Sequence, residues 1–268
     1  MYKLTPTNIE YGTHNWPFYP GCLHRPMGIC PLPNCWAEGM SKRQLQDFHN
    51  PHLIPERLFA PLARKKPARI LVNFMGDLGG SWVDPEMQIQ LPTNSQSTWV
   101  DIVSLNYIVF QVIEHCPQHT FIFLTKNPAA WLKWGKFPDN CWVGATCWDN
   151  ASFHRAIWEL SKVEAKVKWL SIEPLYSKIA AESMDFTMYD INWVVIGAQT
   201  KPDKFPEIEW VREIVEAADR AGVKVFLKDN LKPLFKANHR WDIDLSWAAK
   251  EWVQCEHPIL RQELPCQK

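Results

Sequence analysis

Short apolar runs recur along the chain, separated by longer stretches of mixed polarity. Each run is rich in β-branched or aromatic residues and ends in polar residues or glycine, a pattern typical of buried strands in a parallel sheet. We predict a first strand near Asn8 to Thr13, which brings the number of strands to seven. The other six are Arg69–Met75, Thr120–Thr125, Cys141–Thr146, Val167–Ile172, Ile191–Ile196 and Val223–Leu227.

Two of the intervening stretches have helical periodicity. From Glu207 to Ala221 the apolar residues form one stripe, with Pro206 before it and Gly222 after it. A second helix is predicted from about Thr98 to His115. Strands that alternate with helices at this spacing indicate right-handed βαβ units. We therefore expect an α/β fold, a partial or full (β/α) TIM barrel of parallel strands in a single domain.

The domain organisation predicted from the sequence is simple. Twenty-one prolines punctuate the chain, but we find no internal repeat, low-complexity tract or Gly/Ser linker. Residues 1–240 are expected to form the barrel, and residues 241–268 a C-terminal extension that packs on it.

Composition and charge narrow the class of protein. Hydrophobic residues make up 46% of the chain and charged residues 22%, which fits a folded protein and excludes disordered and fibrous classes. Lys plus Arg and Asp plus Glu each total 29, so a nucleic-acid site has to be local. No apolar run is long enough to span a bilayer, and the first ten residues lack a signal-peptide pattern, so we expect a cytoplasmic protein without a membrane partner.

Polar residues follow each predicted strand, where barrels carry their chemistry. A helix cap or a solvated turn is an equal interpretation for any one of them, but seven such positions together predict the mouth of a site. These positions are the loop 12–35, Gly76 and Asp77, Thr125–Asn127, Thr146 and Cys147, Glu173 and Pro174, Gly197–Gln199, and Lys228–Asn230.

Three of the eight cysteines, Cys22, Cys30 and Cys35, lie within fourteen positions, whereas the other five are scattered and each is expected to be a buried apolar residue. Three thiolates in one loop can serve zinc, an iron–sulfur cluster or redox exchange. A structural zinc site needs a fourth ligand, which His14 or His24 could supply. A [4Fe–4S] cluster held by three cysteines leaves one iron open, and S-adenosylmethionine is the known partner of such an iron.

The residues around these cysteines resemble a known family. Asn15–Cys22, Cys30 and Cys35–Glu38 are similar to the opening of the phage-derived three-Cys-motif family of radical-SAM-like proteins, distant relatives of spore photoproduct lyase. The resemblance extends over about residues 7 to 232. Its further blocks are Asn73–Leu78, Cys116–Pro128, Leu170–Leu175, Trp193–Thr200 and Val225–Asn230.

The cysteine spacing departs from this family. Seven residues separate Cys22 from Cys30 and four separate Cys30 from Cys35, and both gaps are longer than usual in the family. Prolines at positions 31 and 33 restrict the second gap, so the loop either bulges outward or holds an altered site. Because Gly21 and Trp36–Glu38 match the family, we expect the site to be retained.

The resemblance implies a role for each matching residue. Cys22, Cys30 and Cys35 would ligate the cluster, and a strand-end carboxylate would accept the methionyl ammonium. Thr125, Lys126 and Thr146 would lie near the methionyl carboxylate or ribose, and Glu173 and Gln199 would meet ribose, adenine or substrate. Lys228 would contact an anionic substrate. The thiol of Cys141 or Cys147 would donate a hydrogen atom to a product radical. The implied cofactor residues are Met75, Gly76, Asp77, Thr125, Lys126, Thr146, Glu173 and Gln199, and the implied catalytic residues are Cys141, Cys147 and Lys228. Core burial is the competing interpretation for both thiols, and a solvated or salt-bridged side chain is an equal interpretation for Lys228.

Fifteen tryptophans raise the alternative of base stacking, although most of them fall inside strand or helix patterns and are expected in the core. The tryptophans near strand ends that test this idea are Trp131, Trp134 and Trp148.

The leading hypothesis is a radical-SAM enzyme with a [4Fe–4S] cluster and S-adenosylmethionine as cofactors, reduced by a ferredoxin or flavodoxin type of protein. Its substrate class, nucleic acid or a nucleotide, follows only from the kinship with spore photoproduct lyase. One rival is a zinc-stabilised binding module without turnover, and another is a degenerate barrel that kept no cofactor.

Overall fold

A computed structural model describes residues 2–43, 47–91, 102–180, 185–238, 244–253 and 257–265. The chain divides into two compact units. Unit 1 comprises residues 1–143 and 163–166, and unit 2 comprises residues 144–162 and 167–268. The main sheet has eight strands in the order β1-β2-β3-β6-β7-β8-β9-β10. This mostly parallel sheet confirms the predicted α/β class, and closure into a barrel stays a prediction.

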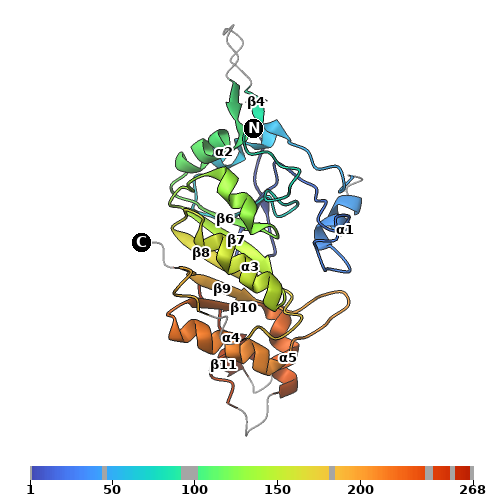
Figure 1. Cartoon of the computed structure of the whole chain (residues 1–268), viewed down its shortest axis with the longest axis vertical. Helices are drawn as coiled ribbons and strands as arrows, with labels where there is room; N and C mark the ends of the chain where they lie inside the picture. The colour runs from blue at the N-terminus through green and yellow to red at the C-terminus, as the bar shows by residue number, and fades with distance from the viewer. Residues whose placement is uncertain are drawn as a thin grey trace. The chain divides into compact units, whose positions relative to one another are not determined.

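Unit 1 carries the N-terminal strands and the cysteine-bearing loop (Figure 1). Two further strands, β4 and β5, pair with each other in a separate antiparallel sheet. The elements of unit 1 in chain order are β1 Thr5–Pro6, β2 His14–Trp16, α1 Trp36–Arg43, the 3-10 helices η1 Pro55–Arg57 and η2 Ala60–Ala63, β3 Arg69–Val72, β4 Gln88–Gln90, β5 Ile102–Ser104, α2 Leu105–Glu114, β6 Thr120–Thr125 and the 3-10 helix η3 Pro128–Trp134, followed by β7 Cys141–Cys147, whose last four residues belong to unit 2.

Two predicted elements are wrong in position. The strand expected at residues 8–13 lies at His14–Trp16, where pairing with β3 holds a segment that has no apolar run. The helix expected from Thr98 begins at Leu105, because Ile102–Ser104 pairs with β4 as a strand, and residues 98–101 lie outside the described part of the chain.

The parallel registers align the carboxyl ends of the central strands of unit 1. Trp16 lies opposite Val72 in β2 and β3, and Leu71 lies opposite Ile122 in β3 and β6. The residues that follow these strands therefore emerge at the same edge of the sheet, which is where the sequence predicted the site.

The tryptophans proposed as stacking platforms belong to the core instead. Trp131 is 0% exposed, Trp134 1% and Trp148 9%. In unit 1, Trp131 and Trp134 contact each other and pack edge-on against Phe123. Because a buried indole face cannot stack on a base, the nucleic-acid hypothesis for these three residues is wrong.

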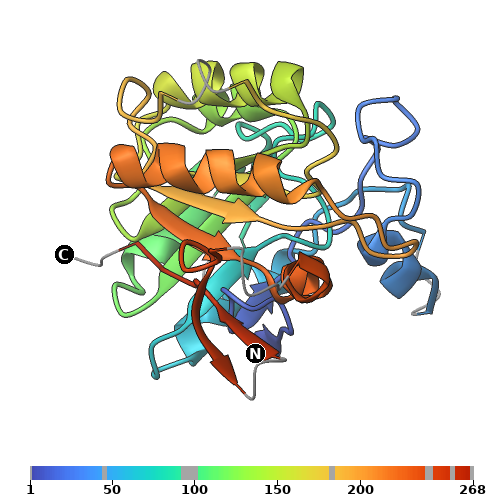
Figure 2. The ribbon, with the colours of Figure 1, turned by 90° about the horizontal axis from the view of Figure 1, so that it is seen from below.

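Unit 2 repeats the strand–helix alternation. In Figure 2, α3 and α4 cover the same face of its strands, as expected for right-handed crossovers. The amphipathic helix predicted at 207–221 is confirmed as α4. The elements of unit 2 are α3 Asn150–Ser161, β8 Val167–Ile172, β9 Trp193–Ile196, α4 Ile208–Arg220, β10 Lys224–Leu227, the 3-10 helix η5 Asp229–Leu231, α5 Lys232–Asn238, β11 Ala249–Val253 and β12 His257–Leu260.

The described part of the C-terminal tail packs within unit 2. Strands β11 and β12 form an antiparallel hairpin, and the residues after it run antiparallel to β10. The N–H of Leu227 donates to the carbonyl of Arg261 at 2.8 Å, and the N–H of Glu263 donates to the carbonyl of Val225 at 2.9 Å. The predicted boundary at residue 240 lies outside the described residues.

Within the described residues, no helix combines the length and the apolar character needed to cross a membrane.

Candidate functional site

Three cysteines of unit 1 lie on the segment that connects β2 to α1. Cys22, Cys30 and Cys35 are free thiols, and each is half-buried. Cys35 directly precedes α1, and its carbonyl accepts the N–H of Gly39 at 3.0 Å. The N–H of Cys30 donates to the carbonyl of His24 at 3.1 Å. All three thiols are therefore available as ligands on one structured loop.

The position of Cys22 is fixed by a close contact between two glycine backbones. Gly21 and Gly76 form a parallel bridge, and the N–H of Gly21 donates to the carbonyl of Met75 at 3.1 Å. A Cβ atom on Gly76 would lie 2.6 Å from the carbonyl oxygen of Tyr19 and 2.7 Å from that of Gly21. Only glycine fits at this position, which explains why the chain has Gly76 beside the first cysteine.

Asn73 adds a further contact between the segment after β2, which contains Tyr19, and the segment after β3. Its backbone has a positive φ of 59°, and its buried side-chain amide pairs with both backbone groups of Tyr19. Oδ1 accepts the N–H of Tyr19 at 2.8 Å, and Nδ2 donates to the carbonyl of Tyr19 at 2.5 Å. The amide thus replaces a strand partner where β3 has ended.

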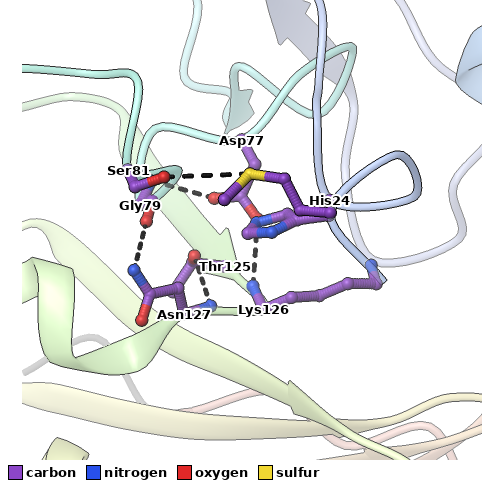
Figure 3. Close-up of polar contacts among 8 residues, drawn as sticks. His24, Asp77, Gly79, Ser81, Thr125, Lys126 and Asn127 are labelled. Atoms are coloured by element: carbon purple, nitrogen blue, oxygen red, sulfur yellow. Dashed lines mark hydrogen bonds and ion pairs between the residues drawn. The ribbon is translucent and has the colours of Figure 1, made fainter. Parts of the chain in front are cut away.

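The carboxylate of Asp77 is the centre of the strand-end cluster (Figure 3). It is 6% exposed and accepts hydrogen bonds from His24 Nε2 at 2.8 Å, from the N–H of Gly79 at 2.8 Å and from the N–H of Lys126 at 3.0 Å. Burial acts to raise the pKa of Asp77, but the hydrogen bond and charge of His24 and the N–H of Lys126 outweigh it and lower the pKa. Asp77 is therefore a carboxylate that joins the cysteine loop to the ends of β3 and β6.

Thr125 and Asn127 close the other side of this cluster (Figure 3). The Thr125 hydroxyl accepts the N–H of Asn127 at 2.9 Å, and Asn127 Nδ2 donates to the carbonyl of Gly79 at 2.8 Å. A Cβ atom on Gly79 would lie 2.2 Å from Thr125 Oγ1. The segment after β3 thus packs directly on the end of β6.

The Cys22 thiol has an unusual electrostatic environment. Burial and the nearby charge of Asp77 raise its pKa to about 12, although the backbone N–H of His24 and the charge of Lys126 act in the opposite direction. A thiol of this kind is protonated at neutral pH, so a metal that binds it has to displace the proton.

The donor set of this loop fits a group held by thiolates. Free thiols are the ligand type that both an iron–sulfur cluster and a zinc site use. In the part of the chain that the structure describes, no three His, Cys, Asp or Glu side chains are grouped closely enough to hold a metal ion. The loop thus offers the ligand types, and its cysteines have to move together to ligate one metal centre.

The other predicted residues lie in unit 2, at the carboxyl ends of its strands. Lys228 follows β10 and Glu173 follows β8, and Lys228 Nζ lies 2.5 Å from Glu173 Oε1. The lysine side chain is 14% exposed and the glutamate 23%. A Cβ atom on Gly197, which follows β9, would lie 3.1 Å from the Glu173 carboxyl carbon. The glycine thus leaves room for this ion pair.

Gln199 belongs to the same strand-end group of unit 2. Its Oε1 accepts the hydroxyl of Tyr176, and its Nε2 donates to the carbonyl of Pro202 at 2.7 Å. The Lys204 ammonium lies over the Tyr176 ring, 5.2 Å from its centroid. Gln199 is 7% exposed, so its amide has a fixed orientation.

The thiols proposed as hydrogen-atom donors are core residues. Cys141 and Cys147 bound β7, and both are 0% exposed. Burial raises the pKa of each well above the usual thiol value. Thr146, in the same strand, is 5% exposed. This placement agrees with the competing interpretation of core burial for both cysteines.

Sequence analysis did not identify several residues of these clusters as contact partners, although some of them lie in the motifs that resemble the family. His24 was considered only as a zinc ligand, and its contact with Asp77 spans 53 positions, which no local pattern indicates. A helpful signal was available for Asn73, because asparagine is enriched among residues with positive φ. The partners missed are Asn73, Gly79, Asn127, Tyr176, Lys204 and Glu38.

Comparison with known proteins gives one match. A family model described as "Protein of unknown function (DUF5131)" matches residues 6–238. No curated protein and no solved structure matches the chain significantly.

Proposed function

We propose that this chain, which belongs to the family "Protein of unknown function (DUF5131)", is a radical-SAM enzyme with its metal centre in unit 1. The observation that carries the proposal is the loop with three free, half-buried thiols joined through His24 and Asp77 to the ends of β3 and β6. Cys22, Cys30 and Cys35 hold a [4Fe–4S] cluster in this proposal. Such a cluster, when bound, supplies an open iron site and an electron for the reductive cleavage of S-adenosylmethionine.

The protein supplies the ligands and their positions. The contact between Gly21 and Gly76 fixes the backbone of Cys22, and the backbone N–H of His24 acts to lower the pKa of its thiol. Hydrogen bonds to cluster sulfurs raise the reduction potential, so this N–H favours uptake of an electron. Half-burial of the loop limits access of water to the thiolates.

Asp77 has a different role in this proposal from the one that the family resemblance implies. Both of its oxygens already accept hydrogen bonds from His24, Gly79 and Lys126, which leaves little capacity for a methionyl ammonium. We therefore assign Asp77 as the residue that positions the cysteine loop. The side chain of Lys126, whose charge acts on Cys22, is the better candidate to meet the methionyl carboxylate.

Ligand contacts in unit 2 are a separate part of the proposal. Glu173, Gln199 and Lys228 follow three adjacent strands, and carboxyl ends of parallel strands are the usual place for ligands. We assign these residues to ribose, adenine or substrate. A nucleotide or nucleic-acid substrate, with a ferredoxin or flavodoxin type of reductant, remains the class that we propose by analogy.

The experiment is anaerobic reconstitution with iron and sulfide, followed by dithionite and S-adenosylmethionine, with iron and 5′-deoxyadenosine measured. We expect about four irons per chain and 5′-deoxyadenosine, both lost in Cys30→Ala. A matched control is Cys116→Ala, a buried cysteine outside the loop, which should retain both. Iron uptake that is unchanged by Cys30→Ala would contradict the proposal.

A zinc site is the second candidate function, and one observation favours it. His24 Nδ1 is buried and, among the described residues, has no hydrogen-bond partner, whereas its Nε2 contacts Asp77. A histidine oriented by a carboxylate is a common zinc ligand. Stoichiometric zinc that depends on both Cys22 and His24, in protein that takes up no iron, would favour this candidate.

A further inference from the structure

Glu38 of α1 is a charged residue in an almost closed environment. It is 8% exposed, and its carboxylate contacts the side chains of an arginine, a lysine and a histidine. Arg25 Nη1 donates to Oε2, while Lys42 Nζ lies 2.9 Å and His49 Nε2 lies 3.5 Å from Oε1. The hydrogen bond from Lys42 lowers the pKa of Glu38; burial acts in the opposite direction, and the charges of Lys42 and Arg25 lower the pKa further.

Two of these side chains also contact the backbone of the cysteine loop. Arg25 Nη2 donates to the carbonyl of Pro33 at 3.0 Å, between the second and third cysteines. His49 Nδ1 lies 3.3 Å from the carbonyl oxygen of Cys22. Glu38 is therefore linked through one side chain each to the start and to the end of the loop.

Helix α1 provides the third connection between Glu38 and the cysteine loop. Cys35 precedes the helix, and Glu38 lies in its first turn with Lys42 one turn later. The loop from Cys22 to Cys35 has no strand or helix to hold it, and the prolines at 31 and 33 lack an N–H. Backbone hydrogen bonds order the first part of the loop, up to Cys30, so the side-chain contacts act mainly on the proline-containing part between Cys30 and Cys35.

We propose that Glu38 is a positioning residue that fixes the conformation of the cysteine-bearing loop by connecting its start and its end to α1. A carboxylate suits this role because it only accepts hydrogen bonds and has room for several cationic donors. This role of Glu38 does not follow from the composition of the loop or from the spacing of its cysteines. The inference concerns the geometry of the thiols, and its use for a cluster rests on the proposed function.

The test measures each thiol separately in the reduced, metal-free protein. Alkylation by iodoacetamide, followed by peptide mass spectrometry, gives one rate per cysteine. In Glu38→Gln we expect Cys30 and Cys35 to react about tenfold faster. A tenfold change corresponds to a free energy of local opening that is lower by ~1.4 kcal/mol. Cys141 and Cys147 are fully buried and report global unfolding, so their rates should not change. The matched control is Glu159→Gln on α3, where the carboxylate pairs with Lys162 just after the helix.

Two further variants keep the test decisive. Glu38→Asp retains the charge and should restore slow alkylation in part, which a role in packing alone would not do. If Glu38→Gln fails to fold, Arg25→Lys replaces it, since lysine retains the charge but cannot reach both Glu38 and Pro33. Unchanged rates at Cys30 and Cys35 in the variant that folds, or equal acceleration at Cys141 and Cys147, would overturn the inference.

Iron binding separates this inference from the proposed function. If wild-type protein takes up no iron, the proposed function fails, while the alkylation rates still decide the role of Glu38. If wild-type protein takes up iron and Glu38→Gln retains full iron with normal alkylation, the inference alone fails.

Discussion

His24 Nε2 lies 2.8 Å from Asp77 Oδ2, and both side chains are almost completely buried. The two residues come from different segments of unit 1, the cysteine loop and the end of β3. Because the carbonyl of His24 also accepts the N–H of Cys30 at 3.1 Å, the contact with Asp77 connects the strand end to the cysteine loop.

Asp77→Asn should destabilise the protein by about 3 kcal/mol, because it leaves a buried imidazole without its anionic partner. It also places an amide N–H₂ among three N–H donors. Denaturant unfolding measures the effect, and the exposed Asp84→Asn is the control, expected to remain within about 0.5 kcal/mol of wild type. A variant as stable as wild type would show that the contact contributes nothing.

Gly76→Ala should cost about 2 kcal/mol, since the new methyl group meets two carbonyl oxygens that belong to backbone and cannot rotate away. Gly39→Ala is a control of opposite sign. Gly39 lies inside α1 with open space at its Cβ position, so alanine should stabilise the helix by up to about 1 kcal/mol. Equal effects of the two substitutions would refute the argument from close backbone approach.

The predicted strands agree with the structure where both faces of the strand are buried, because burial alone then determines the residue types. Thr120–Thr125 and Val167–Ile172 coincide with β6 and β8, because every second side chain of these runs packs on each face of a covered sheet. Strand β2 could not be found in this way. It is three residues long and contains His14 and Asn15, so its pairing with β3, not its own pattern, makes it a strand.

The stability of the fold should fall as the pH drops below about 6.5. Burial lowers the pKa of His119 and of His14 below the usual value near 6.5. The unfolded chain then binds protons at a pH where the folded chain does not, so these residues contribute fully above that pH and their contribution is lost below it. Urea midpoints from pH 7.5 to 5.5 measure the slope, which His119→Gln should reduce. An identical slope in that variant would exclude His119 as a cause.

Lys228 and Glu173 should show a coupling energy of about 1 kcal/mol in a double-mutant cycle, because both are largely buried and lie 2.5 Å apart. The variants are Lys228→Met, Glu173→Gln and the double substitution, compared by urea unfolding. The more exposed pair of Lys178 and Glu213 is the control, with about 0.3 kcal/mol expected. Equal coupling in both pairs would mean that burial adds nothing at the ends of β8 and β10.

The candidate site was predictable only in its residue types. Glycine, aspartate and threonine after apolar runs indicated strand ends, and three clustered cysteines indicated a metal ligand set. The sequence could not show that Asp77 would be occupied by His24 and two backbone N–H groups, since these partners come from three separate segments. Long-range pairing of this kind depends on the register of β2, β3 and β6.

The residues after β12 occupy the side of β10 that faces away from β9, with hydrogen bonds on both sides of Phe226. A strand with an open side exposes a row of N–H and carbonyl groups that can pair with another chain. By covering β10 with its own tail, the protein removes a template for self-association. Loss of residues 261–265 would therefore appear first as aggregation during expression, before any defect at the strand ends of unit 2 could be observed.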